Sequence, residues 1–400
     1  MMNAVASGRW LTDERVTAVA RISALAGIAM LAIWWLGGHG SVDPFGEPIG
    51  RDFTAFYNAG RVANAGHPAS AYNPDVINAS VRSVNGANYP MAWIYPPTFL
   101  FIASPLARLP YLLALLLWYV IGLVAIGLVL AAILPNRRAV MIALASPLTP
   151  MVLGGGQNAF LSAGLLGAGL LMLDRRPAVA GGIFGVLTYK PQLGIGIAPL
   201  LLIERNWRAI AAAIVTTAAL IGLSAMIWGI DSWAAFPGGL ANGRYWMEQG
   251  TSGFDKSASL FSVIRLWGGS IQFGYVVQAI GLVLGLFTIW RCAKADPAVR
   301  NASVCAAVGL STPYFMDYDM ATIGLGAVFL YALCARDGFR RYECSAIAFI
   351  WVAPWFSRAA AGNLLLPLGP PATLLLTWLV LARAGVTASP FRRSRAASAP

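Results

Sequence analysis

One acidic residue stands out in the first long polar interval of the chain, Gly50–Pro110. Asp52 opens the run D-F-T-A-F-Y-N-A-G and has aromatic residues on its C-terminal side. A carboxylate at the edge of an apolar region can accept a proton from a sugar hydroxyl, and partial burial raises its pKa toward the working pH. We therefore predict that Asp52 is a catalytic base. The alternative is a solvated loop acid that pairs with Arg51 or Arg61.

Two cations lie where the surrounding sequence is apolar. Lys190 follows one short apolar segment and precedes another, and Arg358 lies near the end of a third. A cation at membrane depth costs roughly 2.5–3.5 kcal/mol, so we expect a compensating anion, and the phosphate of a lipid would serve. The alternative for each cation is a side chain that extends to the interface and pairs with a nearby acid.

Two acids, Asp317 and Asp319, follow Pro313 at the start of another apolar segment. Paired carboxylates can bind a divalent cation, or they can hold a basic residue such as Lys190 in place. A third interpretation is helix capping, because acids suit the positive end of a helix that begins at Met320.

Amides and aromatic rings complete the candidate set. The turn G-G-G-Q-N at Gly154–Asn158 offers Gln157 and Asn158 to a ligand and its backbone N–H groups to a phosphate, although glycines in a tight turn also serve packing. Several aromatic residues suit stacking on a sugar and equally suit an interfacial belt. They are Tyr57, Tyr72, Trp93, Tyr95, Trp233, Tyr245 and Trp246. His39 and His67 are too few for a catalytic triad or a metal site, so we expect no metal.

The elements that must position these residues are membrane helices. The chain is 58% hydrophobic and 11% charged, whereas a soluble domain is roughly 25% charged. The first apolar run, Ala18–Leu36, is followed by many others, so it is a membrane helix and not a signal peptide.

The net charge of +12 does not indicate nucleic acid, because the basic residues form small clusters between apolar segments, as positive-inside sorting requires. The four cysteines suggest neither a disulfide framework nor a metal site.

The apolar pattern predicts an all-α polytopic membrane protein with about twelve transmembrane helices and both termini in the cytosol. Four of the expected helices are shorter than the roughly 20 residues that a straight crossing needs, so their connecting turns should lie at membrane depth and line a wet cavity. These four are Val140–Leu153, Ala159–Leu173, Ala178–Tyr189 and Leu193–Ile203. In this topology all the polar clusters fall on the outer face, and we predict that they share one site.

We expect a single domain over residues 1–384, followed by a disordered basic cytosolic tail at 385–400. Residues 38–110 should form an outer catalytic loop. Its apolar segment Pro96–Leu109 is interrupted by a proline and is expected to be a re-entrant helix. Residues 230–268 should form a second outer loop.

An ordered series of short motifs resembles glycosyltransferase family 87. The series begins with D-F-x-x-F-Y-x-A-G at Asp52–Gly60 and includes Y-P-P at Tyr95–Pro97 and S-P-L at Ser104–Leu106. Its later members are G-Q-N at 156–158, K-P at 190–191, R-N-W-R at 205–208 and T-P-Y-F-M-D-Y-D at 312–319. Together they cover most of the chain in the order typical of the family.

The resemblance implies a GT-C fold and a cofactor-free, metal-independent transfer of a hexose from a polyprenyl-phosphate sugar, with inversion at the anomeric carbon. Its relatives include the mannosyltransferases of mycobacterial phosphatidylinositol mannoside synthesis, so mannose is the expected sugar. The base of the family corresponds to Asp52. The segment Ser311–Asp319 would lie near the donor phosphate, where mannosyl-transferring relatives tend to have histidine and this chain has Tyr318 and Asp319.

The sequence therefore predicts a transferase of the bacterial inner membrane, with its active site facing the periplasm and a lipid or glycan as acceptor. Asp52 is the expected catalytic base. The expected donor-phosphate residues are Lys190, Arg358, Tyr318 and Asp319, and the expected substrate-binding residues are Tyr57, Tyr95, Gln157, Asn158 and Asp317. Broken helices and a central lysine also suit a transporter or flippase of a lipid-linked or anionic solute. A polysaccharide polymerase or ligase with a lipid pyrophosphate donor is a third possibility.

Overall fold

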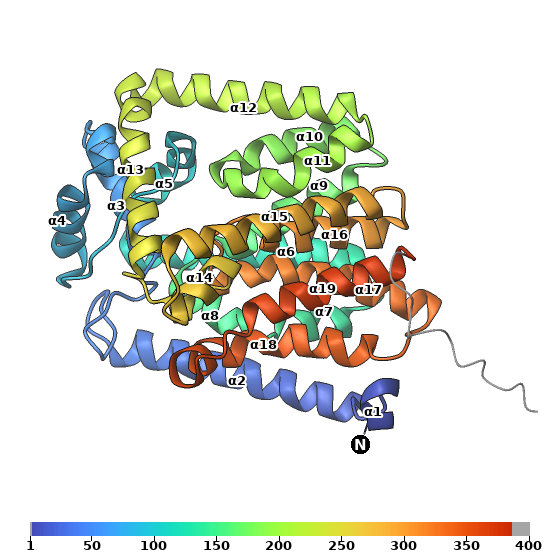
Figure 1. The fold of residues 1–400 in the computed structure, drawn as a ribbon. Coiled ribbons are helices and arrows are strands. Elements are labelled where there is room, and N and C mark those ends of the chain that lie inside the picture. The colour runs from blue at the N-terminus through green and yellow to red at the C-terminus, as the bar shows by residue number, and fades with distance from the viewer. Residues whose placement is uncertain (1, 386–400) are drawn as a thin grey trace, which may run out of the picture.

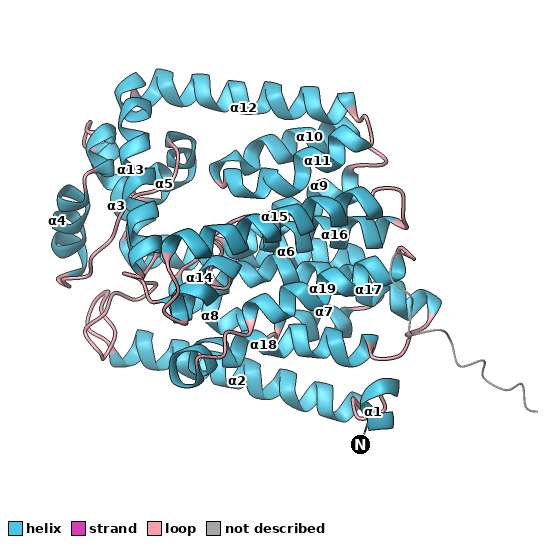
Figure 2. Ribbon diagram, in the orientation of Figure 1, coloured by secondary structure: helices cyan, strands magenta, loops and turns pink. Residues whose placement is uncertain are grey.

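The computed structural model describes residues 2–385, and every regular element in that range is a helix (Figure 2). Within these residues β pairing is limited to isolated bridges, such as that between Ser257 and Met316. The predicted all-α class is therefore confirmed. The tail expected at 385–400 lies outside the described residues, apart from Gly385.

Six helices of the described chain are long and apolar enough to cross a membrane. They are α2 (Asp13–Gly37), α6 (Tyr111–Ile133), α12 (Trp207–Trp228), α15 (Ile271–Cys292), the run formed by η6 (Asp317–Asp319) with α17 (Met320–Asp337), and α18 (Glu343–Leu364). A pair bent by 56°, α7 (Arg137–Leu144) with α8 (Leu148–Gly155), would make a seventh. The side chains of α12 are mostly exposed although they are apolar, so in the cell they must face lipid.

Shorter helices run beside the long ones and are more deeply buried (Figure 1). They are α9 (Ala159–Met172), α10 (Pro177–Val186), α11 (Gly194–Ile203), α16 (Pro297–Ser311) and α19 (Gly369–Arg383). In α16 every residue from Val299 to Ser311 is buried. The bounds of α10 and α11 lie close to those expected from the apolar pattern. The total of about twelve crossings stays a prediction, because these helices are shorter than a straight crossing requires.

The polar segments gather at one end of the helix bundle (Figure 1). They contain α3 (Phe53–Asn64), η1 (Pro68–Tyr72), α4 (Pro74–Asn85), η2 (Pro97–Phe99), α5 (Leu100–Leu106), α13 (Ile230–Gln249), η5 (Phe254–Lys256) and α14 (Leu260–Leu266). In Figure 1 helix α13 runs across the direction of the long helices. Most of the segment expected to be a second outer loop is thus helical.

The opposite end of the bundle holds both ends of the described chain. The backbone N–H of Tyr342 donates to the carbonyl of Ala6 in α1 (Met2–Ser7). Close by, Arg383 of α19 pairs with Glu343 at 2.5 Å. The beginning of α18 therefore meets both α1 and the end of α19, at the end of the bundle farthest from α13 (Figure 1).

Candidate functional site

Asp52 lies immediately before α3 and is fixed by the glycine-rich turn before α9. Its backbone N–H donates to the carbonyl of Gly155 at 2.9 Å, and its carboxylate accepts a hydrogen bond from the side-chain amide of Gln157. Gly156 makes this approach possible: its φ is +65°, and a Cβ there would lie 2.7 Å from the Cβ of Phe53. The turn therefore packs against the start of α3 and orients the carboxylate.

Aromatic packing holds the start of α3 in this position. Phe53 and Phe56, one helical turn apart, both pack against Trp118 of α6, with ring centroids 6.2 and 5.7 Å away. The ring centroids of Phe56 and Tyr95 are 5.3 Å apart. The Tyr95 ring is in turn stacked on the ring of Phe99, with 4.8 Å between their centroids. These rings are largely buried, so the backbone that presents Asp52 is rigidly supported.

The Asp52 carboxylate is partly buried and has no ion-pair partner in the described chain. Burial raises the pKa of Asp52 above its usual value, and the hydrogen bond from Gln157 and the positive charges of Lys256 and Arg358 offset part of that shift. The alternative partner Arg51 pairs with Asp43 instead, at 3.7 Å. Asp52 is thus a carboxylate with a raised pKa and a free proton-accepting capacity.

Two amide side chains beside Asp52 each leave an acceptor unused. The Nδ2 group of Asn158 donates to the hydroxyl of Tyr95 at 2.9 Å. The Oδ1 of Asn158 and the Oε1 of Gln157 are buried without a hydrogen-bond partner in the described chain. An unsatisfied buried acceptor costs roughly 1–3 kcal/mol, so these oxygens are suited to a hydroxyl of a ligand or to water.

Lys190 is held in a buried ion pair. It lies between η3 (Leu187–Tyr189) and η4 (Pro191–Leu193), and its Nζ is 2.6 Å from Oδ1 of Asp319. The other oxygen of Asp319 accepts from the backbone N–H of Met316 at 3.2 Å. Lys190 Nζ also lies 5.5 Å from the ring centroid of Tyr318. Of the interpretations offered by the sequence, Asp319 holds Lys190. Its bond to Met316 caps the short helix η6, whereas the helix that begins at Met320 has no side-chain cap.

Asp317 forms a second pair with the other predicted cation. Its carboxylate bonds to Arg358 of α18 and accepts from the N–H of Tyr318 at 2.7 Å. The Asp317 side chain is 1% exposed, whereas Arg358 is 42% exposed and reaches solvent. Residues 2–385 bring together no group of three or more His, Cys, Asp or Glu side chains that could hold a metal ion.

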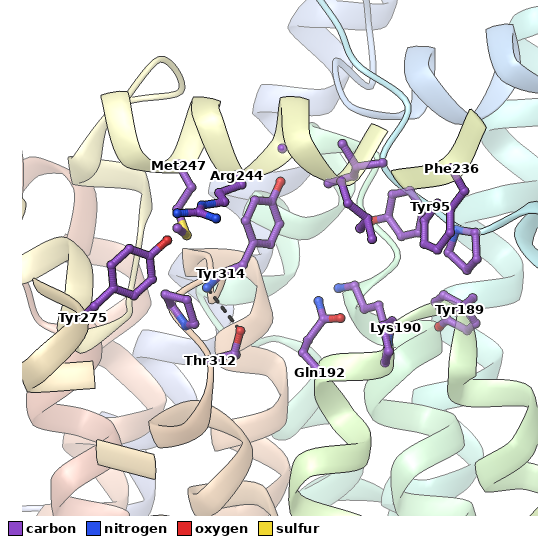
Figure 3. A pocket seen from close by; sticks show the side chains of 16 residues that line it. Tyr95, Tyr189, Lys190, Gln192, Phe236, Arg244, Met247, Tyr275, Thr312 and Tyr314 are labelled. Atoms are coloured by element: carbon purple, nitrogen blue, oxygen red, sulfur yellow. Dashed lines mark hydrogen bonds between the residues drawn. The ribbon is translucent and has the colours of Figure 1, made fainter. Parts of the chain in front are cut away.

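A cavity of about 340 Å³ lies between α13 on one side and the 189–192 and 312–314 segments on the other (Figure 3). Polar and aromatic residues of its wall include Tyr95, Tyr189, Lys190, Gln192, Arg244 and Tyr314. Asp52 is not part of this wall. Burial and the charges of Asp52 and Asp319 together raise the pKa of Tyr314. The hydrogen bond from Asn158 to Tyr95 connects the Asp52 turn to the same wall.

The predicted substrate residue Tyr57 does not line the cavity and serves packing instead. The hydroxyl of Tyr57 donates to the carbonyl of Leu109 at 2.7 Å, and its ring packs on Tyr111. Tyr57 therefore joins α3 to the segment before α6. The predicted residues Tyr95 and Lys190 line the cavity, and Asn158 and Asp319 are bonded to them from behind its wall. The predicted residues Gln157, Asp317, Tyr318 and Arg358 do not line it: Gln157 bonds to Asp52, and Asp317 bonds to Arg358 and to the N–H of Tyr318.

The contribution of α13 to the cavity wall was not predicted from the sequence. Five of its residues line the cavity at helical spacing: Phe236, Leu240, Gly243, Arg244 and Met247. This i, i+4, i+7, i+8, i+11 pattern was the signal that could have identified a helix with one face over the site. The segment instead resembles a loop because it also contains Pro237 and two consecutive glycines.

Comparisons with known proteins give one positive result. A family model described as glycosyltransferase family 87 matches residues 93–313. The matched range contains Tyr95, Asn158, Lys190 and Arg244, and it begins after Asp52. No curated protein and no solved structure matches the chain.

Proposed function

Because this chain belongs to glycosyltransferase family 87, we propose that it transfers a hexose, with mannose as the first candidate, from a polyprenyl-phosphate sugar to a lipid or glycan acceptor. Membership of the family makes the protein a glycosyltransferase. The observation that supports the rest of the assignment is Asp52, an unpaired, partly buried carboxylate. The turn that holds it is hydrogen-bonded to the wall of a cavity with cations and aromatic rings.

Asp52 acts as the general base. It accepts the proton of an acceptor hydroxyl while the hydroxyl oxygen bonds to the anomeric carbon of the donor. The bond from that carbon to the phosphate oxygen breaks on the opposite face, and the electron pair leaves with the polyprenyl phosphate. Gln157 keeps the Asp52 carboxylate oriented, and the free oxygens of Gln157 and Asn158 accept hydrogen bonds from substrate hydroxyls.

Lys190 stabilises the negative charge that grows on the leaving phosphate. It lines the cavity and is held rigidly by Asp319, so little reorganisation is needed when the charge develops. Arg358, held by Asp317, supplies a second positive charge near Asp52. Tyr318 completes the group of residues around the phosphate, and Tyr95 binds the sugar.

We place the site on the periplasmic face of a bacterial inner membrane, in a GT-C arrangement of about twelve crossings within one domain. Two observations support this topology. The site lies at the end of the bundle reached after the first long helix (Figure 1). The described termini lie at the other end, where basic residues such as Arg340 and Arg383 occur, as positive-inside sorting requires.

The second candidate is a flippase of a lipid-linked anion, favoured by the break between α10 and α11 at Lys190. The purified protein, given a labelled polyprenyl-phosphate hexose and a bacterial lipid extract, separates the two functions. A transferase releases free polyprenyl phosphate and moves the label to an acceptor. Movement of intact donor between leaflets, with no cleavage, would rule out the transferase.

A further inference from the structure

A second cation faces the cavity that contains Lys190, and it comes from α13. Arg244 and the apolar residues Phe236, Leu240 and Met247 lie on the cavity side of this helix. In Figure 3 the Arg244 side chain extends from α13 toward Tyr275. The cavity therefore has a cation from α13 in one wall and Lys190 in the other.

The two cations differ in how firmly they are held. Lys190 and Asp319 are 5% and 11% exposed, so separating that pair would leave a buried charge without compensation. Arg244 pairs with Glu248 at 2.7 Å, four residues along the same helix, and its side chain is 69% exposed. An exposed pair of this kind contributes little to stability and is readily exchanged for another anion.

Glu248 retains other partners when Arg244 leaves. Its Oε1 also accepts a hydrogen bond from the hydroxyl of Tyr275 at 2.7 Å, and its backbone carbonyl accepts from Arg265. Because the Tyr275 hydroxyl still donates to it, the Glu248 carboxylate is not left unsatisfied when Arg244 moves to another anion. Tyr275, which lies on α15, lines the cavity as well.

A guanidinium has the geometry that a phosphate requires. Its planar donors can bond two phosphate oxygens at once, whereas an ammonium acts as a point charge. We infer that Arg244 binds the phosphate of the donor, exchanging Glu248 for that phosphate when the lipid enters the cavity. This assignment rests on the proposed function, and it adds a binding residue that no sequence motif had indicated.

The test measures binding of a short-chain polyprenyl phosphate and of the matching polyprenol to the full-length protein in nanodiscs. The polyprenol has the same chain without the phosphate. Arg244→Gln should weaken binding of the phosphate about 10- to 100-fold, as expected for loss of a charge-assisted contact. Binding of the polyprenol should be unchanged. Arg82→Gln, at an exposed arginine on α4, is the matched control and should change neither.

A second variant separates phosphate binding from helix stability. Glu248→Gln removes the competing carboxylate, so binding of the polyprenyl phosphate should tighten or stay equal. If the pair were merely structural, Arg244→Gln and Glu248→Gln would change binding in the same direction.

The possible failures are distinguishable. If the wild-type protein binds the phosphate no better than the polyprenol, the donor class in the proposed function is wrong and the inference falls with it. If the wild-type protein prefers the phosphate but Arg244→Gln keeps that preference, only the role of Arg244 is wrong.

Discussion

At the scale of single residues, three ion pairs and one unpaired carboxylate describe the charge at the candidate site. Lys190 pairs with Asp319, Arg358 with Asp317, and Arg244 with Glu248. Asp52 instead bonds to a neutral amide. A carboxylate that already neutralises a cation is a weak proton acceptor, whereas one with a raised pKa and no cation bound is suited to general base catalysis.

The pH dependence of transfer should report the pKa of Asp52. Only the deprotonated carboxylate can accept a proton, so activity is lost as the pH falls through its pKa. Because burial raises that pKa, the acidic limb of the rate profile should lie above the range of an ordinary carboxyl group. A limb at the ordinary position would contradict the environment described here.

Gln157→Leu should shift the acidic limb of the rate profile to still higher pH. The amide donates to the charged form of Asp52 and thereby lowers its pKa. Its replacement by an apolar side chain removes this stabilisation, so the acidic limb should shift to higher pH. The measurement is the profile of kcat against pH for both proteins, and an unchanged or acid-shifted limb would argue against the contact.

Substitutions of Lys190 and Asp319 should have non-additive effects on stability. Either Lys190→Met or Asp319→Leu alone leaves a buried charge unpaired and should cost about 3–5 kcal/mol of stability. The double variant removes both charges and should regain most of that stability while remaining inactive, because the buried cation that stabilises the leaving phosphate is gone. Thermal unfolding measures the loss and recovery of stability, and transfer assays measure the activity of the double variant. A double variant with substantial activity would exclude Lys190 from phosphate stabilisation.

At the scale of elements, a tight turn and a transverse helix bring the site together. The turn 154–158 supplies amides to Asp52 and Tyr95, and α13 closes the cavity from the other side. Helix α13 packs closely on η1 at Gly239. A Cβ at this position would lie 2.6 Å from Cδ1 of Tyr72, so the close approach requires a glycine. Tertiary packing thus stabilises a helix that its glycine and proline content does not favour.

Gly156→Ala should damage the site through the turn. An alanine there must adopt φ near +65° and would press against Phe53 and the carbonyl of Gly50. The strain alone is of order 1–2 kcal/mol, and the clash displaces Gln157, so both the unfolding temperature and kcat should fall. Gly127→Ala on α6, where a Cβ meets nothing within 4 Å, should be neutral or slightly stabilising.

At the scale of the whole molecule, hydropathy identified the long helices and many bounds of the short ones. The predicted segments Ala178–Tyr189 and Leu193–Ile203 correspond to α10 with η3 and to α11. Long-range partners were less predictable. Lys190 and Asp319 are 129 residues apart, so the sequence left open whether those acids bind a metal, cap a helix or hold the lysine. The cavity wall on α13 was missed for the same reason, since it depends on which segments pack together.

The proposed topology is testable with single cysteines. The native cysteines are buried except Cys344, which is half-buried, so the parent protein should be Cys344→Ser. A cysteine at exposed His67 should react with an impermeant thiol reagent on intact cells stripped of their outer membrane. One at exposed Arg208 should react only after lysis. The reverse pattern would place the site in the cytosol and remove the periplasmic assignment.

The most direct measurement is transfer by Asp52→Asn from a labelled polyprenyl-phosphate hexose. The substitution keeps the size of the side chain but removes the proton acceptor, so kcat should fall about 10²- to 10⁴-fold, while the affinity for the donor stays close to that of the wild-type protein. Asp75→Asn, at an exposed acid on α4, should retain full activity. If folded Asp52→Asn transfers sugar at a rate similar to that of the wild-type protein, Asp52 is not the base.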